Sequence, residues 1–319
     1  MRKEAKTTKT ATLSTVSGYH QGGSWADAES YAFAGFRANK YFTSDRYIGL
    51  DERFNRPDGK PLKGFGLEIE TECRGIHSAT VYAEVLNNVI FTHFPADLFK
   101  LQRDGSLSGD VSAECITQVM TREFIRNNYA AFKLMYDTYF PAFGISCGVN
   151  CGMHVNLSNA LFGRSESAQI EAIRKLFYIV NHHYGFCCAL FNRDSSRTMY
   201  CRQMNSAKDY ARNLDLHNAP GGHGVSMNLD HFASGRVELR LVGGQKNFPC
   251  FRNTMESVFH LVEAVKRLSW SDCDDLVKIF SGCNQYVFDR IKSFCAQRGT
   301  ITSAQIEAIR PTVQREELI

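Results

Sequence analysis

The segment GFGLEIETE, residues 64–72, places three carboxylates on one face of a predicted strand. Apolar and acidic residues alternate along it, and a period of two residues is typical of a β-strand. The acidic face holds Glu68, Glu70 and Glu72 within about 14 Å. Carboxylates this close repel each other unless a cation neutralises them. We therefore interpret Glu68 and Glu70 as metal ligands and expect Glu72 at the rim; an edge strand with a solvated acidic face is the alternative.

The segment CGMHVNLS, residues 151–158, predicts a second strand of this kind. His154 and Asn156 alternate with its apolar residues, and Gly152 before them allows a backbone or a ligand to approach closely. A histidine that only hydrogen-bonds a polar neighbour is the alternative, but we interpret His154 as a metal ligand. Cys151 would then lie beside the site without a catalytic role.

The segment GRVELRLVGG, residues 235–244, predicts a third strand with Glu238 and Arg240 on its polar face. These two could form a surface charge pair. Their apolar neighbours and the following Gly-Gly pair favour burial, and a buried carboxylate needs a partner. Glu114 lies in a short β-prone run after the turn that begins at Asp104. Carboxylates, one histidine and arginine suit a hard cation such as Mg²⁺ and the phosphates that it bridges.

The size and charge of the chain exclude some classes of protein. Its 319 residues can form one large domain or two smaller ones. The net charge is +4, and residues 1–10 hold four basic residues against one acidic residue, so the rest is nearly neutral. This is unlike a dedicated nucleic-acid binder. We see no run of membrane-spanning length and no apolar signal-peptide core, and we expect a cytoplasmic protein.

The eleven cysteines do not form a metal-binding pattern. Their number is odd, their spacing is scattered, and no CxxC pair occurs. A structural zinc site needs paired, regularly spaced ligands. We expect free, buried thiols in a reducing compartment.

The remaining pattern predicts an α+β fold, with an antiparallel sheet that is polar on one face and covered by helices on the other. Residues 1–60 lack a sustained period and are expected to form an N-terminal arm whose first part is disordered. After a long polar connection over 192–224, strands are predicted at 225–230 and, for the third segment described above, at 236–243. Predicted helices cover residues 79–90, 121–139 (capped by Thr121 and stopped by Pro141), 166–190 (capped by Ser165), 249–269, 273–280, 285–297 and 302–310.

Taken in order, these motifs resemble the amidoligases, ATP-dependent carboxylate–amine ligases of the glutamine synthetase and glutamate–cysteine ligase superfamily. The ordered set comprises an FGxEIE strand, a DGSL-type turn followed by a glutamate, a CGxHV(H/N)xS strand, an R-x-x-Y segment, an asparagine before a turn and a final x-E-x-R-L strand. Each motif is short, and the match runs from Gly64 to Gly244. Residues 1–60 and those beyond 270 lie outside it.

The resemblance implies a curved sheet whose concave face holds two or three Mg²⁺ ions between carboxylates and ATP. The implied metal ligands are Glu68, Glu70, Glu114, His154 and Glu238. The implied phosphate-binding residues are Arg240, Arg197 and Arg202, and the first two would also act in catalysis. Asn228 would bind the nucleotide. Asp104 also falls on a family position. Asn156 departs from the second histidine that the family often has, which affects a substrate-side contact. The catalytic domain would cover 61–270, with 271–319 as a helical extension packed on it.

The expected activity is formation of an amide or isopeptide bond through an acyl phosphate. The substrates would be a small-molecule or peptide carboxylate and an amine, recognised by loops at 74–100 and 203–224. Two alternatives remain open at this point. One is a metal-dependent hydrolase or phosphotransferase with the same carboxylates, and the other is a catalytically silent relative with a structural role.

Overall fold

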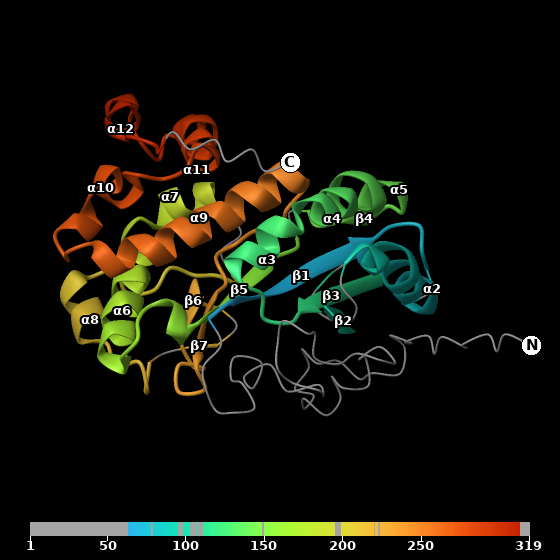
Figure 1. Cartoon of the computed structure of the whole chain (residues 1–319), viewed down its shortest axis with the longest axis horizontal. Helices are drawn as coiled ribbons and strands as arrows, with labels where there is room; N and C mark the ends of the chain where they lie inside the picture. The colour runs from blue at the N-terminus through green and yellow to red at the C-terminus, as the bar shows by residue number, and fades with distance from the viewer. Residues whose placement is uncertain are drawn as a thin grey trace, which may run out of the picture.

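One antiparallel sheet forms the centre of the part of the chain that the computed structural model describes, which is residues 63–77, 79–94, 98–102, 107, 111–148, 150–194, 199–219, 221–222 and 224–312. Its strands are β1 (Phe65–Cys73), β2 (Phe99–Gln102), β3 (Val111–Thr117), β4 (Ile145–Ser146), β5 (Met153–Ser158), β6 (Met227–Asn228) and β7 (Arg236–Leu239). Their order is β2–β3–β1–β5–β7–β6, and β4 pairs with β1. The sheet is curved and open, as Figure 1 shows, so the predicted α+β class is confirmed. The expected N-terminal arm, Asp104 and Arg197 lie outside the described residues.

The helices of the described residues either cover the apolar face of this sheet or pack on the helices that do. They are α2 (Ala79–Val85), α3 (Arg122–Asn127), α4 (Tyr129–Lys133), α5 (Phe140–Ala142), α6 (Glu166–His182), α7 (Tyr184–Leu190), α8 (Lys208–Asn213), α9 (Phe248–Arg267), α10 (Leu276–Phe280), α11 (Gln285–Arg290) and α12 (Ser303–Ala308). Short π-helical segments continue α2, α4 and α11 over 86–90, 134–139 and 291–295. Figure 1 shows α9, α3 and α4 together on one side of the sheet.

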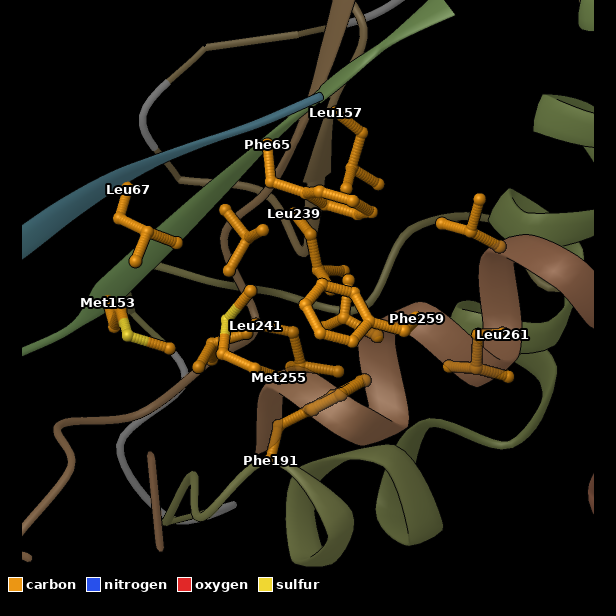
Figure 2. Packing of buried hydrophobic residues seen from close by; sticks show 14 of the residues in the cluster. Phe65, Leu67, Met153, Leu157, Phe191, Leu239, Leu241, Met255, Phe259 and Leu261 are labelled. Carbon is orange, nitrogen blue, oxygen red and sulfur yellow. The ribbon is translucent and has the colours of Figure 1, made fainter. Parts of the chain in front are cut away.

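The alternation seen in the sequence decides which strand residues face α9. Leu67 of β1, Leu157 of β5 and Leu239 of β7 are each at most 1% exposed. Figure 2 shows Phe259 and Met255 of α9 directed towards this apolar face. The Phe65 and Phe259 rings meet edge to face with their centroids 4.8 Å apart. Each fully buried side chain of this kind contributes about 1.5–3 kcal/mol, so slipping a strand by one residue is strongly disfavoured.

Two predicted helix starts are confirmed, and one predicted helix end is wrong. The Thr121 hydroxyl accepts a hydrogen bond from the Phe124 N–H at 3.1 Å, and the Ser165 hydroxyl accepts one from Ala168 at 3.3 Å. Pro141 does not stop the helix, because it lies inside α5 in the first turn after the π-helical segment. Proline is tolerated there, since a first-turn N–H has no intrahelical acceptor.

The strands near the C-terminal part of the sheet are shorter than predicted. Beyond Leu239 the Arg240 and Leu241 N–H groups both donate to the Ser226 carbonyl at 3.0 Å, and this ends the regular ladder of β7. The connection over 192–224 contains the helix α8, which the sequence did not predict. The short strands β2 and β4 were also not predicted.

The C-terminal helices pack against α9 and against the end of α7. The Asn284 amide donates to Glu256 of α9 at 2.7 Å. The Arg290 guanidinium donates to the carbonyls of Leu190 and Ala189 at 3.1 and 3.4 Å. The division of the chain into a catalytic domain and a helical extension stays a prediction.

Candidate functional site

The ladder registers bring the predicted acidic residues together on one face of the sheet. Glu70 of β1 lies opposite Glu114 of β3, and Glu68 lies opposite His154 of β5. Glu238 is one strand farther, on β7, which pairs with β5. Residues directly opposite each other on antiparallel strands project to the same face. The five side chains come from four neighbouring strands, and all lie opposite the face that packs on α9.

Two overlapping triads result, and they share the His154 ring. One is Glu68, His154 and Glu238, and the other is Glu70, Glu114 and His154; within each, the ligand atoms lie within 4.8 Å of one another. The five side chains are between 0% and 9% exposed. His154 Nδ1 lies 3.4 Å from Glu68 and 3.3 Å from Glu238, and Nε2 lies 3.5 Å from Glu70. The sequence therefore correctly predicted that these residues converge.

The chemistry of this donor set fits a hard divalent cation. Carboxylate oxygens with one imidazole suit Mg²⁺ or Mn²⁺, whereas structural zinc sites usually include thiolates. Neither triad found among the described residues contains a cysteine. All eleven cysteines are free, and all except Cys250 are buried, as predicted. A neutral imidazole offers one lone pair, so His154 can serve as a ligand in one triad at a time.

Polar neighbours fix the orientation of two of the carboxylates. The Gly152 N–H donates to Glu70. The Asn156 amide donates to Glu68 at 2.8 Å and accepts a hydrogen bond from the buried Arg236 at 2.5 Å. Asn156, the departure from the family pattern, therefore links a buried cation to a candidate metal ligand. A Cβ at position 152 would lie 3.2–3.3 Å from Glu70, His154 and Arg193, which explains the glycine there.

Arg240 lies inside the cluster rather than at its edge, and it is 7% exposed. Its Nη1 donates to Glu238 at 2.6 Å and lies 3.4 Å from His154 Nδ1. Its Nε is buried and has no hydrogen-bond partner among the described residues. Asn228 of β6 donates to the other oxygen of Glu238 at 3.2 Å. Arg240 and Asn228 therefore hold the Glu238 carboxylate between them.

Other predicted residues are placed differently. Arg202 is exposed, and its Nε donates to the Gly224 carbonyl at 3.4 Å, which is not a contact with either triad. Glu72 is 6% exposed and belongs to neither triad. It lies farther along β1, opposite Ser112 of β3 and Ser146 of β4, and the strand β4 was not predicted.

Arg193 is a site residue that the sequence did not indicate. It is 8% exposed, and its Nη2 donates to the carbonyls of Val242 and Arg240 at 2.7 and 3.2 Å. Its Nε donates to the Leu241 carbonyl at 3.4 Å. These contacts fix the backbone at and just beyond Arg240. Arg193 lies in a loop without periodicity, so the sequence holds no local signal for this role.

The surroundings of His154 alter its acidity. Burial and the Arg240 charge each lower the pKa of His154, whereas the hydrogen bond to Glu68 and the charges of Glu70 and Glu238 raise it. The net result is a pKa above the usual value of 6.5. In the metal-free protein these carboxylates therefore favour the imidazolium form of His154 more than water does.

We expect the metal-free protein to lose the stabilisation from protonated His154 as the pH rises. Because the pKa is raised in the folded state, this stabilisation is complete below about pH 6.5, the ordinary pKa of histidine, and is lost as the pH passes through the folded-state pKa. Urea unfolding of wild type and of His154→Gln, both treated with chelator, measures the effect across pH. The difference between their free energies of unfolding should shrink towards alkaline pH. A difference that does not vary with pH would contradict this assignment.

Among the described residues, no helix combines the length and apolar character that a bilayer span requires. No family model and no curated protein matches the chain. Among solved structures, one that is similar to this chain is described as a GmaS/ADP complex, with 15% sequence identity and a TM-score of 0.39. The alignment covers 77% of this chain and 66% of that one. A likeness at this level identifies neither a family nor a ligand for this chain.

Proposed function

We propose that this protein is an ATP- and Mg²⁺-dependent carbon–nitrogen ligase of the amidoligase type. The observation that carries the proposal is the convergence of four carboxylates and His154 with Arg240 on one buried sheet face. The ordered motifs between Gly64 and Gly244, which resemble those of the amidoligases, support the same activity. The substrates would be a small-molecule or peptide carboxylate and an amine.

The metal ligands would be the residues of the two triads. Glu68, Glu70, Glu114, Glu238 and His154 would hold two or three Mg²⁺ ions. When bound, these ions neutralise the charge of phosphate oxygens. Asn156 and Asn228 hold Glu68 and Glu238 in fixed orientations through their amide groups. Such second contacts commonly keep ligand carboxylates in position for a metal.

Arg240 would bind the phosphoryl group that is transferred. Its Nε is a buried donor with no hydrogen-bond partner among the described residues, and a guanidinium can hold two phosphate oxygens at once. Arg193 would fix the backbone of Arg240 during this contact through the hydrogen bond to its carbonyl. We extend the phosphate-binding role to Arg197 and Arg202 on the resemblance alone.

The reaction would proceed in two steps. A carboxylate oxygen of the substrate attacks the γ-phosphorus of ATP in line, the bond to the β–γ bridging oxygen breaks, and an acyl phosphate and ADP result. The amine then attacks the acyl carbon, loses a proton and expels inorganic phosphate. Both reactants of the first step are anionic, so fixed cationic groups account for much of the rate enhancement.

The same triads could instead hold the ions of a metal-dependent hydrolase, where they would supply Lewis acidity to activate a water. Arg240 favours the ligase, because hydrolysis of an uncharged substrate does not require a buried guanidinium. Turnover without nucleotide would support the hydrolase. Absence of metal binding would support the silent relative.

We expect ADP release to be stimulated by the correct carboxylate and amine pair with Mg²⁺ present. A screen of amino acids, polyamines and peptides identifies the pair, and hydroxylamine in place of the amine should give a hydroxamate. With oxygen-18 in the substrate carboxylate, one labelled oxygen should appear in the released phosphate, because the acyl carbon–oxygen bond breaks in the second step. Phosphate without label would show that no acyl phosphate forms.

A further inference from the structure

The guanidinium of Arg240 contacts atoms that the first triad would offer to a metal ion. Arg240 Nη1 lies 2.6 Å from Glu238 Oε1 and 3.4 Å from His154 Nδ1. Those two atoms face each other at 3.3 Å. A cation bound between them would sit within van der Waals contact of Nη1 and would meet its positive charge. The guanidinium and a metal ion cannot both occupy this position.

The second triad differs in this respect. Glu70 contacts the Gly152 N–H and the His154 ring, and no lysine or arginine among the described residues lies within 4.0 Å of its carboxylate oxygens. The buried Arg193 is near, but its guanidinium donates to backbone carbonyls. On Glu70, no lysine or arginine side chain therefore has to move before a metal ion binds.

We propose that Arg240 is a tethered counter-ion that competes with metal for the first triad and leaves it when an oxyanion binds. The inference rests on the proposed metal and phosphate site and deepens it by giving an order of binding. The first ion binds at Glu70, Glu114 and His154. A second ion enters at Glu68 and Glu238 only when phosphoryl oxygens draw the Arg240 guanidinium away.

Two features make this exchange local. The Arg240 carbonyl is held by Arg193 at 3.2 Å, and the Arg240 N–H donates to the Ser226 carbonyl at 3.0 Å, so the backbone is fixed on both sides. Movement is then confined to the side-chain torsions of Arg240. The unpaired Nε also means that the guanidinium gains a hydrogen bond when it turns to an oxyanion.

The exchange has a thermodynamic consequence. An oxyanion that removes Arg240 from Glu238 improves binding of the second metal ion, and the second metal ion improves binding of the oxyanion by the same factor. Couplings of this kind commonly change affinity by about 5- to 150-fold. A site without nucleotide would therefore hold one ion and not the full cluster.

The test uses Mn²⁺ alone as the probe, with free Mn²⁺ measured by electron paramagnetic resonance. Chelator-treated wild-type protein should bind one Mn²⁺, with a second at least about tenfold weaker, a difference of about 1.4 kcal/mol. Arg240→Gln should bind the second Mn²⁺ about tenfold more tightly than wild type. Arg267→Gln is the control, because it removes an arginine at the end of α9 that donates to the Ser281 carbonyl and is in neither triad. It should leave the second binding constant within a factor of about two.

A second measurement has its main result in wild type, which does not depend on how Arg240→Gln folds; the variant serves there only as a control. Sulfate, a weak ligand of Mn²⁺ that offers phosphate-like oxygens, should tighten the second Mn²⁺ in wild type and have no such effect in Arg240→Gln. Equal binding of two Mn²⁺ in wild type without a sulfate effect would overturn the exchange while leaving the metal site intact. So would equal changes in the Arg240 and Arg267 variants. Failure of wild type to bind any Mn²⁺ would overturn the proposed function itself, and the exchange with it.

Discussion

Arg240→Ala is expected to reduce ATP turnover at least about 10³-fold, the range that a phosphate-binding arginine contributes to phosphoryl transfer. The side chain lies on the polar face of the sheet, and its hydrogen bonds go to Glu238 and His154 and not to the packed core. Its loss therefore removes a cation from the transferred phosphoryl group without leaving a cavity in the core against α9. Steady-state ADP formation with the identified substrate pair measures the effect.

Arg240→Lys should also be poor, because an ammonium cannot hold two phosphate oxygens as a planar guanidinium does. Arg267→Ala is a suitable control, since Arg267 is exposed at the end of α9 and donates to the Ser281 carbonyl. Thermal unfolding with Mg²⁺ present separates loss of function from loss of fold. Wild-type turnover in the lysine variant would show that Arg240 does not clamp phosphate.

Gly243→Ala is expected to destabilise the protein by about 3 kcal/mol and to disturb the site at the same time. A Cβ at this position would overlap the Asn192 carbonyl group, with the carbonyl carbon only 2.8 Å away and the Arg193 Cα at 3.1 Å. All these neighbours are backbone atoms, so they cannot move away by a change of rotamer as a flexible side chain can. The Gly243 N–H also donates to the Phe191 carbonyl at 2.9 Å, and separating the two segments would break this bond.

Gly185→Ala provides the matched control. Gly185 lies in α7, and a Cβ there would meet nothing within 4 Å. The same substitution should stabilise the protein by about 0.4–1 kcal/mol at this position, because alanine has less freedom to lose on folding. Urea unfolding of both variants gives the comparison. Equal stabilities would mean that the close approach at Gly243 is easily relaxed.

Alternation along the strands made much of the site predictable. Once one side of β1 is assigned to the core, the period of two places Glu68 and Glu70 together on the other side, and the same holds for His154 on β5. Glu114 needed the family resemblance, because its β-prone run is short. The pairing of these strands in one sheet then brings their side chains together. The sequence of a single strand does not specify its partner or register.

The unpredicted features arise from tertiary contacts. Arg193 sits in a loop, and its role depends on the backbone beyond β7 passing within hydrogen-bond distance. The end of β1 at Glu72 pairs with β4, a strand of only two residues. Pro141 marks a helix boundary in most sequences, but here a π-helical segment ends just before it and a new turn begins. None of these arrangements can be predicted from the local propensities of the residues.

The hydrogen bond from Arg298 to the Arg193 carbonyl, 3.1 Å long, connects the far end of the chain to the site. The Arg290 guanidinium also donates to the last carbonyls of α7. These bonds hold the loop that carries Arg193, and Arg193 in turn donates to the Arg240 carbonyl. The recognisable motifs stop at Gly244, but the scaffolding of the site continues about fifty residues farther. A chain cut after Gly244 would keep every residue of the two triads and would lose the Arg290 and Arg298 side chains that contact the end of α7 and Arg193. We therefore expect residues beyond Gly244 to be needed for Arg193 to hold the backbone of Arg240.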